Sequence, residues 1–152
     1  MWILGRNNFD NDGERQKGVS RGITVTTIIA VLVLVIISSQ PTKVTFLDEG
    51  LKIHGMYGDV YEWESVENVR LLDELPEIGV RTNGSAIGPN LKGYFSTQAY
   101  GTVKLFVNTG KPPFVFFEYK GKIIIFNLIN AEKTKLTLEN ILIKTEMDEN
   151  DE

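Results

Sequence analysis

The chain has 152 residues, enough for one domain and a small additional segment. It contains no cysteine and a single histidine, His54, which excludes disulfides, thiolate metal sites, cysteine nucleophiles and histidine clusters. The net charge of −4 is uneven, because residues 146–152 carry five acids and no base, whereas residues 41–145 hold twelve acids and twelve bases. A neutral domain has no bulk attraction for nucleic acid, so we expect no nucleic-acid partner.

Residues 23–40, ITVTTIIAVLVLVIISSQ, contain neither a charge nor a proline. A helix of this length nearly spans the hydrocarbon core of a bilayer, which is about 30 Å thick, and the threonines can bond back to their own helix. A buried strand would be shorter and would alternate. A cleaved signal peptide would end in a small-x-small cleavage site, and VIISSQ lacks a good one. The pattern therefore predicts a retained transmembrane helix over residues 23–40.

Charges on the two sides of this span indicate its direction. Arg15, Lys17 and Arg21 precede it, whereas Lys43 is followed by Asp48 and Glu49. Basic residues favour the cytoplasmic side. We expect residues 1–22 to be cytoplasmic and the domain of residues 43–145 to lie outside the cell membrane.

From Lys43 onward, short alternating runs separated by turns predict a mainly β domain. In GTVKLFVN, for example, Val103 and Leu105 share one face and Lys104 the other. SVENVRLLDEL reads as a helical turn leading into a strand. Residues 130–146 predict a C-terminal helix with Asn130 as its N-cap. The sum is about seven antiparallel strands followed by one helix, and then an acidic, disordered tail over residues 146–152.

This order of elements resembles the pleckstrin-homology (PH) fold, in which two sheets form a partial barrel and a C-terminal helix plugs one end. The segments LKIHGMYG, VRLLDELPEIGVRTNG, LKGYF, GTVKLFVN, PPFVFFE and IIIFNL resemble those of a bacterial PH-domain family whose members often carry a membrane segment before the domain. The resemblance implies a fold and a tether, without a ligand. Asp48 and Glu49 stand where phosphoinositide-binding PH domains are basic, so inositol-lipid binding is not expected.

Residues 77–95 raise the question of a binding loop, because glycines alternate there with basic residues. The stretch lacks the GK[ST] of a nucleotide-binding loop. Asn83-Gly84 is typical of a turn, which favours a structural role. The alternative is a recognition loop for an anion or a carboxylate. The candidate recognition residues are Arg81, Asn83, Lys92 and Lys111.

No nucleophile has a recognisable activating partner, and no cofactor or metal motif is present. We therefore expect a non-enzymatic, membrane-anchored binding or scaffolding module for a protein or peptide partner, with no cofactor. Two alternatives remain. One is a lipid- or headgroup-sensing module in which Arg81, Lys92 and Lys111 form a basic patch. The other is a cell-envelope hydrolase, which would need two close carboxylates or an activated hydroxyl.

The expected orientation can be tested with a cysteine, because the chain has none of its own. Asn150→Cys should react with a membrane-impermeant thiol reagent in intact cells, since the domain is expected outside. Labelling is scored on protein that resists carbonate extraction. Reaction only after lysis would place the domain in the cytoplasm.

Overall fold

A computed structural model describes the backbone of residues 9–149 and the side chains of residues 17–147. The chain divides into two compact units, with the boundary between Ile37 and Ser38. Residues 1–8, the start of the predicted N-terminal segment, lie outside the described residues, as do Asn150, Asp151 and Glu152.

The described residues of the first unit belong to one helix, α1 (Phe9–Ser39), which begins well before the predicted span. Its section Lys17–Ser39 is long and apolar enough to cross a membrane. At 1.5 Å per residue, this section is about 35 Å long, against a hydrocarbon core of about 30 Å. The hydroxyls of Thr24, Thr26 and Thr27 donate to the carbonyls four residues earlier, at 2.9 Å, as the sequence predicts. The helix can therefore carry these threonines without leaving their hydroxyls unpaired.

The second unit begins with a small antiparallel sheet of three strands. Its order is β1-β2-β3, which leaves β1 at one edge. A 3₁₀ turn, η1 (Trp63–Ser65), then leads into the next strand; it lies earlier in the chain than the predicted helical turn and shares only Ser65 with it. The strands are β1 (Val44–Phe46), β2 (Gly50–Ile53) and β3 (Val60–Glu62).

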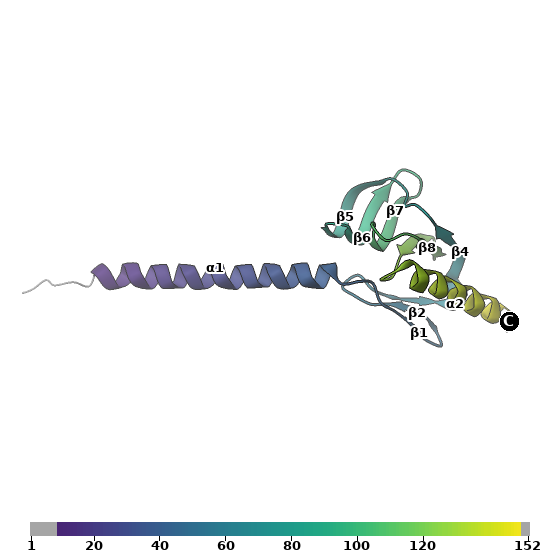
Figure 1. Cartoon of the computed structure of the whole chain (residues 1–152), viewed down its shortest axis with the longest axis horizontal. Coiled ribbons are helices and arrows are strands. Elements are labelled where there is room, and N and C mark those ends of the chain that lie inside the picture. The colour runs from purple at the N-terminus through teal and green to yellow at the C-terminus, as the bar shows by residue number, and fades with distance from the viewer. Residues whose placement is uncertain (1–8, 150–152) are drawn as a thin grey trace, which may run out of the picture. The chain divides into compact units, whose positions relative to one another are not determined.

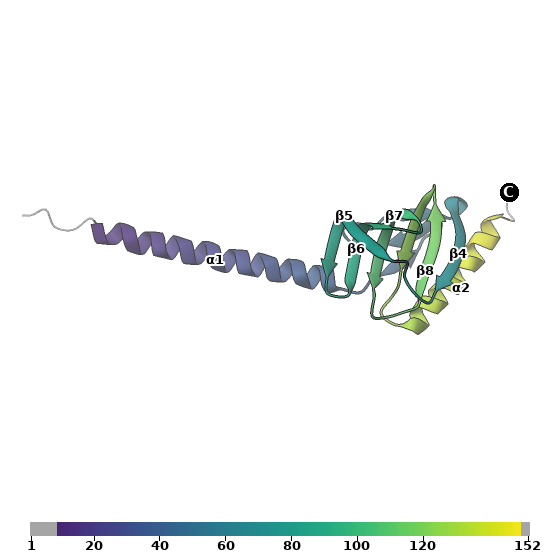
Figure 2. The ribbon, with the colours of Figure 1, turned by 90° about the horizontal axis from the view of Figure 1, so that it is seen from above.

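A larger sheet of six strands follows, with the order β4-β8-β9-β7-β6-β5. Strand β9 lies between β7 and β8, so it pairs antiparallel with β8 and parallel with β7. Figures 1 and 2 show this sheet as a curved layer, with α2 beside β4. The strands are β4 (Val66–Leu72), β5 (Ile78–Ile87), β6 (Asn90–Thr97), β7 (Gly101–Asn108), β8 (Phe114–Tyr119) and β9 (Lys122–Phe126).

The C-terminal helix, α2 (Ala131–Glu149), begins where the sequence predicts. The side chain of Asn130 accepts a hydrogen bond from the Lys133 amide at 2.9 Å, which makes it the N-cap. The helix continues to Glu149, so the first part of the predicted disordered tail is helical. Ile141 is fully buried and joins the core between the two sheets.

The central strands of the large sheet are buried on both faces. One face shares a core with the small sheet and α2, through residues such as Phe106, Phe117 and Phe126. The other face carries Val103, Leu105 and Phe116, and residues of β5, β6 and the β4–β5 connection close over it. The two-residue alternation predicted for β7 is confirmed, although Lys104, on its polar side, is only 8% exposed.

The prediction of a mainly β domain with a C-terminal helix is therefore confirmed. The predicted number of strands is too low, since residues 9–149 contain nine strands instead of about seven. The predicted all-antiparallel pairing is also wrong, because β7 and β9 run parallel. The order of strands along the sequence does not reveal that β9 lies between β7 and β8, because strand pairing depends on contacts between residues far apart in the chain.

The predicted turn at Asn83-Gly84 is wrong, because both residues lie inside β5. The turn of the β5–β6 hairpin falls at Gly88-Pro89 instead. Gly84 faces Gly93 across the hairpin, and both have positive φ angles, +150° and +115°. A Cβ on Gly84 would overlap the backbone of Lys92 and Gly93. Glycine at both positions thus allows the two strands to approach each other closely.

Gly84→Val should destabilise the domain by about 3 kcal/mol, because it adds a β-branched side chain at a strained φ and against backbone. Arg81→Ala, on the same exposed strand, is the matched control and should change stability by less than about 0.5 kcal/mol. Urea denaturation of residues 38–152 measures both. Equal destabilisation by the two variants would show that Arg81 is itself a structural partner.

Candidate functional site

An open groove runs between strand β1 and the N-terminal half of α2. Its volume is about 720 Å³. We call it the β1 groove and define it by the residues that line it: Pro41, Thr42, Lys43, Val44, Thr45, Phe46, His54, Leu128, Ile129, Lys133, Leu136 and Thr137. Six of these residues are consecutive. Three of the six, Val44, Thr45 and Phe46, form β1. Because successive side chains of a strand point to opposite faces, a groove touched by all three follows the edge of the strand.

The backbone of β1 presents unused hydrogen-bonding groups to this edge. On the β2 side, the carbonyl of Lys43 accepts from the His54 amide and the Leu47 amide donates to the Gly50 carbonyl, both at 2.9 Å. Since the direction alternates along an antiparallel strand, the amides and carbonyls of Val44 and Phe46 point away from β2. Among the described strands, β1 pairs with β2 alone, so these groups face the open edge.

The chain that forms the start of the groove is fixed to the large sheet. The buried hydroxyl of Thr42 donates to the Phe106 carbonyl at 2.8 Å. The ammonium of Lys92 donates to the Gln40 carbonyl at 2.6 Å. Farther along, Phe46 stacks on Trp63 with 5.8 Å between ring centroids. The strand edge is therefore held in place before any partner binds, which lowers the entropy cost of binding.

The groove combines apolar surface with positive charge. Ile129 and Leu136 line it while remaining 46% and 50% exposed. Lys43 and Lys133 also line it, and the described lining residues include no acid. The Thr45 hydroxyl and the His54 ring are hydrogen-bonded to each other at 2.8 Å. An extended ligand with an apolar side chain and a carboxylate would match this lining.

A smaller polar pocket of about 110 Å³ adjoins the groove and shares Pro41, Thr42, Leu128 and Ile129 with it. It brings together two of the predicted recognition residues, Lys92 and Lys111. Burial lowers the pKa of Lys92. A network of asparagines forms its wall: Asn108 donates to Asn90, and the Asn127 amide donates to the carbonyls of Asn108 and Lys111.

The other two predicted recognition residues lie elsewhere. Arg81 and Asn83 are on the exposed strand β5, opposite Phe95 and Tyr94, and they are not among the described residues that line either pocket. The structure therefore does not gather Arg81, Lys92 and Lys111 into one concave surface.

A second cluster surrounds the buried ammonium of Lys104. It lies 3.9 Å from an Asp59 carboxylate oxygen and 5.5–5.6 Å from the ring centroids of Tyr61, Tyr94 and Phe106. The buried Tyr61 hydroxyl has no hydrogen-bond partner among the described residues, and burial raises its pKa. Aromatic faces and a carboxylate stabilise the charge of Lys104 within the fold, so this cluster is structural.

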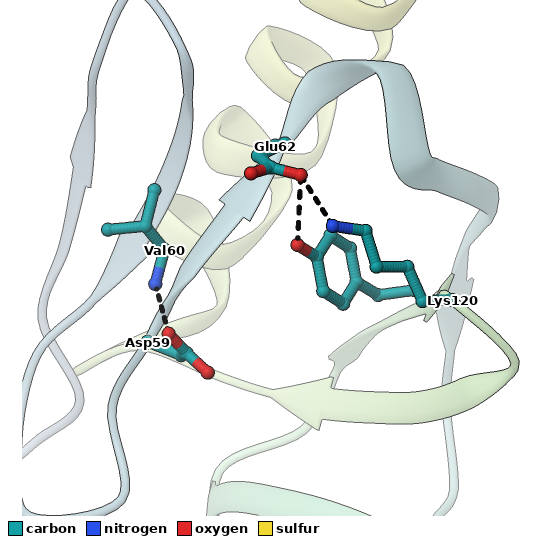
Figure 3. A network of polar contacts seen from close by, with 5 residues as sticks. Asp59, Val60, Glu62 and Lys120 are labelled. Carbon is teal, nitrogen blue, oxygen red and sulfur yellow. Dashed lines mark hydrogen bonds and ion pairs between the residues drawn. The ribbon is translucent and has the colours of Figure 1, made fainter.

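Glu62 belongs to a third cluster, on the surface, where Figure 3 shows it beside Lys120. One Glu62 carboxylate oxygen accepts hydrogen bonds from Lys120 at 2.6 Å and from Tyr119 at 3.4 Å. The hydrogen bond from Lys120 holds the pKa of Glu62 below its ordinary value. A carboxylate that is paired and easily ionised is poorly suited to act as a general acid near neutral pH.

Among the described residues, no three His, Asp or Glu side chains gather as a metal site would require. The sequence matches no protein-family model, and neither curated proteins nor solved structures give a match to it. The resemblance to bacterial PH domains thus depends on the quoted segments alone.

Sequence reasoning did not find the β1 groove. One signal was present, since KVTFL reads as the first strand of the domain and a first strand is often at an edge. The second wall comes from Leu128 to Thr137, about ninety residues later in the chain. Only the tertiary packing of α2 places that wall beside β1.

Thr42→Val should lower the stability of residues 38–152 by about 1 kcal/mol, because it removes a buried hydrogen bond to Phe106. Thr45→Val is the matched control, since its hydroxyl bonds only at the exposed surface, and it should cost less than about 0.5 kcal/mol. Urea denaturation measures both. If Thr45→Val costs as much as Thr42→Val, the Thr42 hydrogen bond does not anchor the groove.

Proposed function

We propose that this protein is a non-enzymatic, membrane-anchored binding module whose β1 groove takes an extended segment of a protein or peptide partner. The observation that carries the proposal is an open groove along the free edge of a pre-positioned strand. The partner segment adds to the small sheet as a strand beside β1. Such strand addition takes its affinity from main-chain hydrogen bonds and its specificity from side-chain pockets.

The lining defines the chemistry of the partner. Its backbone pairs with the outward amides and carbonyls of Val44 and Phe46. An apolar side chain of the partner covers Ile129 and Leu136 and removes their exposed apolar surface from contact with water. Lys43 and Lys133 favour a carboxylate, either at the end of the partner segment or on an acidic side chain.

We further propose that the domain is related to bacterial PH-like proteins. Two sheets that share one core, with a C-terminal helix packed on that core, support the relation. The position of β9 between β7 and β8 departs from an antiparallel meander. The relation adds a membrane-tethered context, with residues 1–22 in the cytoplasm and the domain outside, and it names no ligand.

Headgroup sensing is the second candidate, because Lys92 and Lys111 line one polar pocket. The pocket is small, and Lys92 already donates to the Gln40 carbonyl. A phosphate would have to displace that hydrogen bond. These contacts favour the larger β1 groove as the binding site.

A photo-crosslinking amino acid at position 129 of the full chain, in native membranes, tests the proposal. It should form adducts with a protein partner. The same amino acid at Val80 is the matched control, because Val80 is also exposed and apolar but lies on β5. No comparable adduct is expected from position 80.

A backbone variant connects the adduct to strand addition. Val44→Pro removes the outward amide of β1 and should reduce the adduct at position 129 at least tenfold, whereas Val44→Ala keeps the amide and should retain most of it. An adduct that survives Val44→Pro, or one formed only at position 80, contradicts strand addition at β1. Lipid adducts at position 129 would favour headgroup sensing instead.

A further inference from the structure

Helix α2 has a second apolar side that faces away from the core. Its inner side consists of Thr134, Thr137 and Ile141, all buried. Its outer side carries Leu136, Ile143 and Met147, which are 50%, 54% and 60% exposed, with the exposed Asn140 between them. At 100° per residue, the mean directions of the two sides differ by about 120°, a third of a turn. We call the row Leu136, Asn140, Ile143 and Met147 the α2 seam.

The spacing of the seam is that of a two-stranded coiled coil. Its four members are four, three and four residues apart, which places Leu136 and Ile143 at d positions and Asn140 and Met147 at a positions of a heptad. The core-facing residues Thr134 and Ile141 fall at b positions, on the side of the helix away from the seam, whereas the buried Thr137 is an e residue that borders the seam. An isolated asparagine at an a position is a known determinant of parallel, two-stranded pairing.

The charges beside the seam are self-complementary. In this register Glu139 is a g residue and Lys144 is an e residue. In a parallel pair, a g residue lies beside the e residue five positions later on the other helix. Glu139 of one copy would therefore meet Lys144 of the other, twice by symmetry. Both side chains are exposed, and neither is in an ion pair within the described part of the chain.

We propose that the α2 seam binds the α2 seam of a second copy of this chain as a short parallel coiled coil. Each helix supplies both halves of the charge pairing and an asparagine to face its own counterpart, so the chemistry selects an identical partner. Two heptads are too short for free peptides to associate. Here the core already holds α2 folded, so association does not have to order the helix.

The proposal is independent of the β1 groove, because Asn140, Ile143 and Met147 do not line it. Leu136 lines the groove as well as the seam, so tests of the seam avoid that residue. A membrane tether, if present, would raise the local concentration of the second copy.

Disulfide trapping of the full chain in native membranes tests the geometry, because the chain has no cysteine. Asn140→Cys or Ile143→Cys should give disulfide-linked dimers, since facing a or d residues come within disulfide range. Lys135→Cys is the matched control: it is exposed on α2 but off the seam, and should give few dimers. Equal crosslinking at positions 135 and 143 would overturn the proposal.

Charge reversal tests the partner and the register together. Glu139→Lys should weaken dimerisation roughly tenfold, because both symmetric pairs become repulsive. Adding Lys144→Glu to the same chain should restore it. Analytical ultracentrifugation of the full chain in detergent measures the dissociation constant. Failure of the double variant to recover overturns the parallel register.

Ile143→Glu separates the seam from the fold and from α1. Because Ile143 is half exposed, this variant should keep the melting temperature while abolishing trapping through Asn140→Cys. Dimers that persist undiminished in Ile143→Glu would show that another surface, such as α1, holds the copies together, and would refute the seam.

Discussion

The fold depends on burying both faces of three adjacent strands, β7, β9 and β8. Strands β8 and β9 are nearly continuous apolar runs, β7 alternates, and the side chains of all three divide between two cores. One face needs the small sheet and α2 as its cover, and the other needs the large sheet to curl over it. Even the buried lysine of these strands, Lys104, is held among aromatic rings and near Asp59. The placement of the small sheet, of α2 and of the curled strands β5 and β6 follows from this requirement.

The small sheet that covers one face has a free edge at β1, and the large sheet has one at β5. The two edges differ in how well they are protected from pairing with another strand. Strand β5 has two register shifts and carries Arg81, features that discourage pairing with another strand. Strand β1 has neither device. It is regular over Val44–Phe46, it is fixed by Thr42 and by the stacking of Phe46 on Trp63, and it adjoins exposed apolar surface. An unprotected edge beside a groove favours the addition of a partner strand, whereas a protected edge discourages it.

The sequence could predict those features whose signals lie in neighbouring residues of the chain. The apolar helix, the N-cap at Asn130 and the strands of alternating residues depend on neighbours in the chain, and they were predictable. Strand β5 was not, because Asn83-Gly84 has the composition of a turn and an edge strand shows little alternation. The insertion of β9 and the burial of Lys104 depend on pairing between distant segments, which no local pattern encodes. The same holds for the β1 groove, and of the predicted recognition residues only Lys92 and Lys111 come together.

Helix α2 connects the two proposed surfaces, because its N-terminal half forms a wall of the β1 groove and its outer side forms the seam. Leu136 belongs to both. If two copies pair through the seam, the assembly carries two β1 grooves, and a partner with two extended segments would bind the second groove at a high effective concentration. A short, shallow strand edge such as β1 gives modest affinity by itself, because only a few main-chain hydrogen bonds are available. Pairing of copies through α2 would raise the avidity of weak grooves without any change in the grooves themselves.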